Sequence, residues 1–338
     1  MRYIIITSET TSGGIAVTQT YMRIIHDALI LSGNECFYYS DSTKLTQNDI
    51  LVFDECKAAV KFWLKGYKNF HIWMQGVGPE EALMQGYPRY KYWIRSILEF
   101  ICLKYSGFIY FCSDEMRNHY SRKYHISFSK DKYYIMPCFN EYGIDDSAFT
   151  QEKYNKNTFV YLGSLSKWQC FEKTVEVYKK IEEKLDDSKL FVFTEEKGSA
   201  IEVLNRYKIK NYQVKHVKAD ELGDYIKGIK YGFVLREDNI VNRVATPTKL
   251  SNYISHGIIP IYSDVLSSFH KYNERKLRLG VVCNVDDLSN GINNILRNTE
   301  SRMDVDDIIK RCAEAFSDYY GTETHKERIV DLIKNDKQ

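Results

Sequence analysis

Short apolar runs alternate with helix-spaced apolar positions along the first part of the chain. The runs fall at residues 3–7, 36–39, 50–53, 70–74, 107–111 and 133–136. Runs of this length, bounded by turn residues, are typical of buried strands. Between the first two runs, apolar residues at 17, 21, 24, 25, 28 and 29 have the spacing of a helix with one buried face. Buried strands that alternate with helices predict a parallel sheet covered on both faces.

A second series of the same kind follows a polar, aperiodic segment, which is typical of a domain boundary. Its runs fall at 158–161, 190–193, 212–216, 231–235, 258–262 and 279–282. The sequence therefore predicts an α/β protein with two tandem Rossmann-like doubly wound parallel-sheet domains that face each other across a cleft. The expected bounds are a first domain at 1–140, a linker at 141–157, a second domain at 158–319, and a C-terminal helix at 320–338 that packs back on the first domain.

The stretch 231–262 holds a strand, a polar loop, a helix and a second strand. Thr246 is expected to cap the helix, with Pro247 in its first turn and Gly257 after its last turn. A helix N-terminus attracts anions, and Lys249 stands in the first turn, so the stretch predicts a phosphate site. The alternative is a solvated lysine beside an ordinary surface loop.

Composition and charge exclude several classes of protein. The 47 Lys and Arg nearly balance the 45 Asp and Glu, so nucleic acid is not an expected partner. Eight cysteines at scattered spacings favour reduced thiols and a cytoplasmic protein. No apolar run reaches the roughly 20 residues that a membrane span needs. The turn at Gly13 and Gly14 lacks the G-x-G-x-x-G fingerprint, so NAD binding is not expected.

Six segments, spread over nearly the whole chain, match the motifs of one enzyme family in their order. They are the Gly-Gly turn at 13–14, SGNE at 32–35, FCSDEM at 111–116, YIMPCFN at 134–140, VYLGSLS at 160–166, and ATPTKLSNY at 245–253 with HGIIP at 256–260. The last pair is similar to "PTKxxEYLAxGxPVI". Together the segments resemble the GT-B fold glycosyltransferases of family 4, which are retaining enzymes that use nucleotide sugars.

The resemblance fails at several positions that carry charge in the family. Ser164 and Gln169 stand where an Arg and a Lys usually neutralise the donor diphosphate. Asn252 and Val244 replace two glutamates, and Gln75 replaces a first-domain histidine. If the donor is conventional, its diphosphate is left to the basic residues Arg236, Arg243 and Lys249.

Carried onto this sequence, the resemblance implies a catalytic set of Arg236, Lys249 and Gln75. It implies that Arg236 and Lys249 bind the diphosphate, that Asn252 binds the ribose, and that Gln75 faces the reaction centre. For His216 a structural role is the alternative to a contact with the base. The implied donor-binding residues are Gly13, Gly14, Gly163, Ser164, His216, Val217, Glu237, Asn242, Thr248 and Asn252.

Glycosyl transfer needs stabilisation of the charge that builds on the leaving phosphate, and preorganised cations supply it without a metal. No D-x-D motif stands at a strand end, so no metal and no obligatory cofactor are expected. The predicted function is transfer of a hexose from a UDP- or GDP-sugar to a glycan acceptor in polysaccharide, lipopolysaccharide or glycoconjugate synthesis. The alternative is a catalytically impaired GT-B accessory protein that stabilises a partner glycosyltransferase.

The segment 57–132 is basic and rich in aromatic residues. It holds 13 Lys or Arg against 6 Asp or Glu. Such a surface suits peripheral contact with an anionic membrane, where lipid-linked glycan acceptors reside, and this places the protein at the inner face of the cell membrane. The alternative is a solvated face whose aromatic residues belong to the core.

Overall fold

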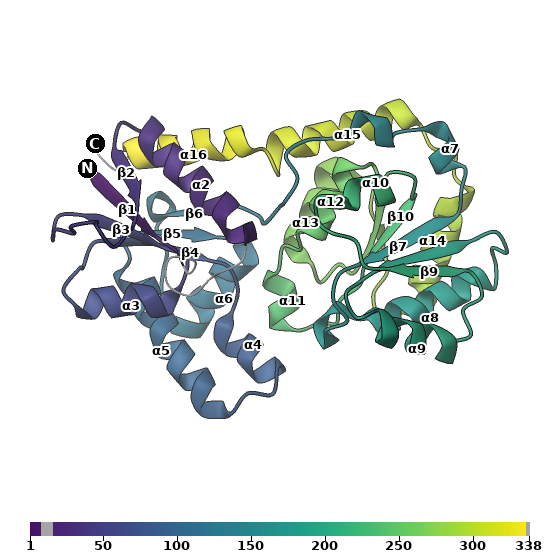
Figure 1. Ribbon diagram of the computed structural model, residues 1–338, viewed down its shortest axis with the longest axis horizontal. Coiled ribbons are helices and arrows are strands. Elements are labelled where there is room, and N and C mark those ends of the chain that lie inside the picture. The colour runs from purple at the N-terminus through teal and green to yellow at the C-terminus, as the bar shows by residue number, and fades with distance from the viewer. Residues whose placement is uncertain (8–15, 336–338) are drawn as a thin grey trace. The chain divides into compact units, whose positions relative to one another are not determined.

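The computed structural model describes residues 1–7 and 16–335, and the chain divides into two compact units. The first unit contains Met1–Cys138, Val244–Thr246 and the chain from Thr322 onward. The second contains Phe139–Arg243 and Pro247–Gly321. Figure 1 shows that each unit is built on a central sheet with helices on both of its faces. The predicted Gly13 and Gly14 lie outside the described residues.

The first unit has a six-stranded parallel sheet in the order β2-β1-β3-β4-β5-β6. The inner strands β1, β3, β4 and β5 are almost entirely apolar and buried, as a sheet covered on both faces requires, whereas the edge strand β2 is mostly exposed. The strands are β1 (Arg2–Ile6), β2 (Glu35–Tyr38), β3 (Ile50–Phe53), β4 (Phe70–Met74), β5 (Phe108–Phe111) and β6 (Tyr133–Ile135). The helices are α2 (Ala16–Leu31), α3 (Cys56–Leu64), α4 (Gly78–Met84), α5 (Arg89–Tyr105), α6 (Asp114–Tyr124) and α16 (Thr322–Asn335).

The last helix of the chain belongs to this first unit. α16 packs along α2, and both lie on the same side of the sheet, opposite α3 and α5 (Figure 1). The hydroxyl of Tyr134 and Nδ1 of His325 are 2.7 Å apart, and Nζ of Lys326 lies 3.2 Å from Oδ2 of Asp27. The sheet of the first unit is thus covered by residues from both ends of the chain.

The second unit has another six-stranded parallel sheet, in the order β12-β11-β10-β7-β8-β9. The strands are β7 (Thr158–Leu162), β8 (Lys189–Phe193), β9 (Tyr212–Lys215), β10 (Tyr231–Val234), β11 (Ile259–Tyr262) and β12 (Val281–Val282). The helices are α7 (Gln151–Tyr154), α8 (Phe171–Glu182), α9 (Lys197–Arg206), α10 (Leu222–Ile226), α11 (Ile240–Val244), α12 (Lys249–Ser255), α13 (Ser267–Tyr272), α14 (Leu288–Glu300) and α15 (Val305–Asp318). Two doubly wound parallel sheets confirm the predicted α/β class.

The helix of the 231–262 stretch begins later than the sequence predicted. α12 starts at Lys249 with Thr248 as its N-cap, and the loop before it contains the short helix α11. Thr246, which belongs to the first unit, uses its hydroxyl to accept a hydrogen bond from the amide of Cys138 at 2.9 Å. Thr246 therefore binds Cys138 and does not cap the helix. Gly257 has the predicted left-handed conformation, with φ of +60°.

Candidate functional site

Three elements of the second unit deliver charged and polar groups to the carboxyl edge of its sheet. β7 ends at Leu162, and Gly163 follows it. β10 ends at Val234, and Arg236 follows two residues later, while Lys249 opens α12. The carboxyl ends of parallel strands meet at one edge of a sheet, which is where doubly wound proteins bind ligands.

Two of these side chains converge on one neutral oxygen. Oε1 of Gln169 accepts a hydrogen bond from Nη2 of Arg236 at 2.6 Å and another from Nζ of Lys249 at 2.8 Å. Arg236 also donates to the carbonyl of Leu235 at 2.8 Å, and Lys249 donates to the carbonyl of Leu162 at 2.6 Å. Both cations are therefore held in place by carbonyl and amide oxygens.

Neither cation forms an ion pair with any residue in the described ranges. Arg236 is 4% exposed, and burial lowers the pKa of its guanidinium. Burial, together with the charge of Arg236, lowers the pKa of Lys249 well below its ordinary value. A buried cation and a half-buried one without a counter-charge carry a cost that a bound anion relieves, so this edge can bind an anion with several oxygens, such as a diphosphate.

Gly163 allows this arrangement to form. Its φ of +113° is one that residues with a side chain rarely adopt. A Cβ at this position would lie 3.2 Å from Nζ of Lys249. The amide of Gly163 donates to the carbonyl of Phe193 at 3.0 Å, so this backbone donor is already used within the sheet. Gly163 thus leaves room for the lysine.

Ser164 and Thr248 border the same edge without a direct contact to the two cations. The exposed Ser164 has its hydroxyl 2.9 Å from that of Ser166, and its carbonyl accepts a hydrogen bond from Tyr161 at 2.6 Å. Thr248 caps α12 through its backbone, with no side-chain capping bond. Because α12 has only 7 residues, we assign the attraction for anions to the side chains of Arg236 and Lys249 rather than to the helix N-terminus.

Asn252 lies one turn beyond Lys249 on α12 and contacts a carboxylate. Its Nδ2 donates to Oε1 of Glu141 at 2.6 Å, and its Oδ1 accepts from Nδ2 of Asn140 at 3.1 Å. Burial raises the pKa of Glu141, although His256 and the bond from Asn252 oppose the rise. Glu141 therefore supplies a carboxylate beside Asn252, the position at which the family that the sequence resembles has a glutamate. Sequence reasoning placed Glu141 in the linker, and no local spacing indicates its contact.

Four of the predicted donor residues lie in other surroundings. Asn242 is buried, and its Nδ2 donates to the carbonyl of Glu237 at 2.9 Å, so it fastens the loop before α12. The side chain of Glu237 is exposed. His216 is also exposed, and it makes no hydrogen bond or ion pair with a described residue. It is followed by the partly buried Val217 after β9, which is the edge strand of the sheet.

Arg243 does not join Arg236 and Lys249 at Gln169. It forms two hydrogen bonds to the carboxylate of Asp238, at 2.5 and 2.7 Å, so its charge is compensated. It does border a cavity of about 170 Å³ that Arg236, Asp238 and Ser263 also line. Of the three predicted diphosphate cations, Arg236 and Lys249 thus share one acceptor, while Arg243 is paired with Asp238.

The first unit has a larger cavity at the carboxyl end of β4. It measures about 730 Å³ and is lined by residues that include Gln75, Glu81, Lys91 and Ile94. Gln75 is exposed, and its Oε1 accepts a hydrogen bond from the Thr18 hydroxyl at 3.3 Å. The cavity is large enough for one or two sugar rings, and both its acidic and its basic side chains can bind hydroxyl groups.

Glu81 forms part of the wall of this cavity. The amide of Val77 donates to its Oε1 at 3.1 Å, and burial raises the pKa of the carboxyl group. A Cβ at Gly76 would overlap the same oxygen, so a side chain there would displace the Glu81 carboxylate. A carboxylate with a raised pKa that borders a cavity is a candidate acceptor of a proton or a hydrogen bond. The sequence indicates that Glu81 begins a helix, where acids are favourable, with a role toward the acceptor as the alternative.

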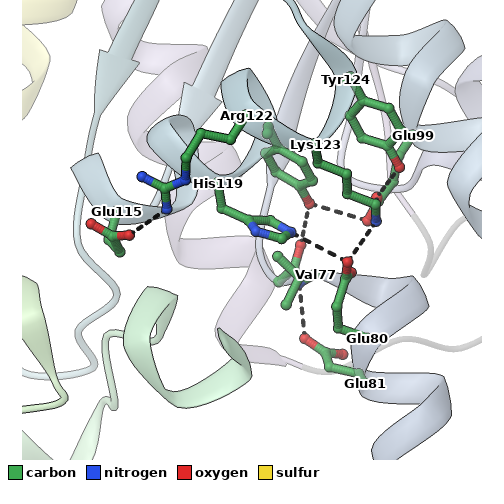
Figure 2. A network of polar contacts seen from close by, with 11 residues as sticks. Val77, Glu80, Glu81, Glu99, Glu115, His119, Arg122, Lys123 and Tyr124 are labelled. Carbon is green, nitrogen blue, oxygen red and sulfur yellow. Dashed lines mark hydrogen bonds and ion pairs between the residues drawn. The ribbon is translucent and has the colours of Figure 1, made fainter. Parts of the chain in front are cut away.

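A buried network behind the cavity joins α4, α5 and α6. Figure 2 shows Lys123 between two glutamates, with Nζ at 2.8 Å from Oε1 of Glu80 and 3.2 Å from Oε2 of Glu99. Burial raises the pKa of Glu99 to about 7, and Lys123 and Tyr124 only partly oppose it. Burial would also raise the pKa of Glu80, but bonds from His119 and Lys123 outweigh it and lower the value. The network fixes α4 and α5 around the cavity.

The described residues provide neither a metal site nor a membrane-spanning helix. They contain no group of three or more His, Cys, Asp or Glu side chains arranged to hold a metal ion. None of the described helices combines the length and the hydropathy needed to cross a membrane. All eight cysteines are free thiols.

No family model matches the sequence, and no curated protein matches it. Solved structures do match its fold. Sucrose-phosphate synthase from Thermosynechococcus elongatus matches with a TM-score of 0.69 at 12% identity over 99% of both chains. Anabaena HepE, in complex with UDP and glucose, matches with a TM-score of 0.66 at 10% identity over 98% of this chain and 99% of HepE.

A variant of S. aureus TarM, whose structure contains UDP, matches with a TM-score of 0.63 at 11% identity. The match covers 85% of this chain but only 55% of TarM, so the chain accounts for about half of that protein's length. At these identities the likeness shows the fold. The chain has the GT-B fold, with two Rossmann-like domains, that the sequence predicted.

Proposed function

We propose that the protein is a glycosyltransferase that moves a sugar from a nucleotide-sugar donor to a glycan acceptor. The observation that supports this function best is the pair Arg236 and Lys249, two cations that share the single neutral oxygen of Gln169 at the carboxyl edge of a parallel sheet. The two cations have only neutral oxygens as acceptors. A diphosphate would supply negative charge and several acceptor oxygens. The second unit would bind the donor, and the cavity of the first unit would bind the acceptor.

In the proposed reaction, an acceptor hydroxyl forms a bond to the anomeric carbon while the bond from that carbon to the diphosphate oxygen breaks. The bonding electrons move to the diphosphate, and the proton of the acceptor hydroxyl passes to an oxygen of that leaving diphosphate. Arg236 and Lys249 stabilise the negative charge that develops as the bond breaks. Preorganised cations in a water-poor site are effective because they need little reorganisation during the reaction. Glu81 and Gln75 in the cavity of the first unit would orient the acceptor hydroxyl.

The finer identity of the donor is also a proposal. UDP is present in the HepE and TarM structures, which favours a uridine nucleotide over GDP. The carboxylate of Glu141, held by Asn252, suits the hydroxyl groups of a ribose. The resemblance to family 4 implies a hexose, retention of its anomeric configuration, and an acceptor in polysaccharide, lipopolysaccharide or glycoconjugate synthesis.

The test is nucleotide binding by the whole protein, followed by turnover. UDP or GDP should raise the unfolding midpoint by mass action, and the matching nucleotide sugar should be consumed when acceptor is present. Replacing Arg236 or Lys249 with Gln should weaken nucleotide binding about 10- to 100-fold, because a bond between charged partners contributes about 1.5–3 kcal/mol. Arg206→Gln and Lys227→Gln are matched controls, since both cations are exposed and paired with acids of the second unit.

Unchanged binding in both site variants would contradict the proposal. A second candidate function is a GT-B accessory protein that stabilises a partner glycosyltransferase. The neutral Gln169 at the centre of the cation pair favours it, since the resemblance has a lysine there. That candidate predicts little or no nucleotide binding and no turnover in any variant, but a stable complex with a second protein.

A further inference from the structure

The outward face of α5 is apolar, which is unusual for a surface helix. Tyr90, Trp93, Ile94 and Ile97 follow the 3.6-residue helical period, and each is more than half exposed, from 54% for Ile94 to 64% for Trp93. The opposite face is buried and contains a charged residue, Glu99. A helix on a globular protein normally has the reverse pattern, with apolar side chains inside and charged ones outside. The exposed stripe therefore indicates a surface that binds something.

The charged side chains of α5 that reach solvent have a single sign. The basic residues of α5 are Arg89, Lys91, Arg95 and Lys104, and its one acid, Glu99, is buried against Lys123 and two tyrosines. The neighbouring α3 adds the exposed Leu64 and further lysines, and its Trp63 stacks on Tyr105 of α5 at 5.0 Å. We call the four apolar residues Tyr90, Trp93, Ile94 and Ile97, with their basic neighbours Arg89, Lys91 and Lys104, the α5 face.

We propose that the α5 face docks on an anionic lipid bilayer, with α5 lying in the plane of the interface. Trp and Tyr side chains favour the boundary between headgroups and acyl chains, since each has an apolar body and a polar group. Isoleucines beside them can enter the acyl region, while the flanking cations bind anionic headgroups. The helix has 17 residues and is about 25 Å long, which is enough for such a contact to be cooperative.

A bilayer fits this surface better than a protein partner does. A protein interface of this kind would pair the cations with specific carboxylates, whereas lipid headgroups supply mobile negative charge along the whole stripe. Each cation near an anionic bilayer strengthens binding by about fivefold. Because no described helix can cross a membrane, the contact would be peripheral and sensitive to salt.

The large cavity of the first unit opens beside this face. Lys91 and Ile94 belong to the α5 face and also line the cavity of about 730 Å³. Docking would therefore place the rim of the cavity at the level of the headgroups. Given the proposed glycosyl transfer, this position favours an acceptor glycan that is attached to a lipid. The docking itself does not depend on that function.

Vesicle co-sedimentation of the full chain tests the proposal. The protein should sediment with vesicles that contain phosphatidylglycerol at low salt, sediment much less at high salt, and remain in solution with phosphatidylcholine alone. Trp93→Ala combined with Ile97→Ser should reduce binding at least tenfold. Ile201→Ser is the matched control, since it removes an exposed apolar side chain from α9 of the second unit. Neither Trp93 nor Ile97 lines the cavity.

Three outcomes would overturn the proposal. They are failure to bind anionic vesicles at low salt, equal binding by the double variant and the wild type, and a dimer in light scattering that dissociates in the double variant. The third outcome would assign the face to a second copy of the chain. Nucleotide-induced stabilisation, measured on the same samples, separates this test from that of the donor site, because the double variant should keep it.

Discussion

Gln169 places a neutral oxygen at the point where two cations converge. A phosphate oxygen offers the same donors a stronger, charged acceptor, so a diphosphate would compete with the amide for Arg236 and Lys249. Without a bound diphosphate, Oε1 of Gln169 keeps both cations oriented, at 2.6 Å from Nη2 of Arg236 and 2.8 Å from Nζ of Lys249. A lysine at position 169 would add a third positive charge to the same small volume. We therefore interpret Gln169 as the residue that lets two cations lie close together without an anion.

This interpretation predicts the effect of replacing the neutral amide of Gln169 with a carboxylate. In Gln169→Glu, the carboxylate would pair with both cations, raise the unfolding midpoint, and occupy the position that a diphosphate needs. The affinity for UDP should fall about 10- to 100-fold, because charged bonds of about 1.5–3 kcal/mol must be broken for the nucleotide to bind. Calorimetric titration with UDP, together with a thermal melt, measures both effects.

Gln169→Leu serves as the control for that substitution. It removes the shared acceptor without adding charge, so it should lower stability while leaving both cations available to UDP. An affinity in Gln169→Glu equal to that of the wild type would mean that the diphosphate does not bind between Arg236 and Lys249.

At the scale of elements, the strands were predictable and the long-range contacts were not. Strands covered on both faces must be apolar throughout, so their runs are visible in the sequence, with ends that differ by one or two residues. The start of α12 was wrong because Thr246 and Pro247 look like a cap, while the hydroxyl of Thr246 binds Cys138. A local pattern cannot show a partner that is 108 residues away.

The same reasoning explains which site residues could be predicted. Arg236, Lys249 and Gly163 follow strand ends or open a helix, so their positions could be inferred from the element order. The bond of Glu141 to Asn252 spans 111 residues and crosses a polar segment without periodicity. Lys123 and Glu99 meet only because α5 and α6 approach each other in the folded unit. The spacing of residues along the sequence does not predict such long-range pairs.

The network that joins α4, α5 and α6 predicts a dependence of stability on pH. The pKa of Glu99 rises from 4.5 to about 7, so the folded state binds this proton more tightly than the unfolded chain does. Proton binding by Glu99 therefore contributes to the free energy of unfolding. This contribution is fully present below about pH 4.5, is lost as the pH rises through about 7, and amounts to about 3 kcal/mol at most. Glu99→Gln should remove this part of the pH dependence.

Urea unfolding of the wild type and Glu99→Gln between pH 4.5 and pH 8 measures that difference. The variant should gain stability relative to the wild type as the pH rises. Glu115→Gln is the control, because Glu115 pairs with the exposed Arg122 at 2.8 Å and should follow the wild type at every pH. Parallel curves for wild type and Glu99→Gln would show that Glu99 is ionised in both the folded and the unfolded state.

At the scale of the whole molecule, the two units do not correspond to two continuous halves of the chain. The first unit takes α16 from the far end of the chain, and this helix packs on α2 through contacts that include His325 and Lys326. A chain that ends at Gly321 should therefore lose stability in the first unit, although the second unit remains complete. The expected loss is several kcal/mol, since a buried helical face is removed.

The tryptophans allow this loss to be localised. Trp63, Trp73 and Trp93 belong to the first unit, and Trp168 belongs to the second. In a truncated variant that keeps only the first-unit tryptophans, the fluorescence should report unfolding under milder conditions than in the full chain. A variant that keeps only Trp168 should unfold as the full chain does. Coincident transitions in both variants would mean that the two units unfold together.

The place of α16 also has a consequence for how the protein is made on the ribosome. The last strand of the first sheet, β6, ends at Ile135, but the helix that covers α2 begins only at Thr322. At translation rates of about 5–20 residues per second, roughly 10 to 40 s pass between the two. During this interval the apolar flank of α2 has no partner in its own unit, so a nascent chain of this protein should be a client of chaperones that bind exposed apolar surface.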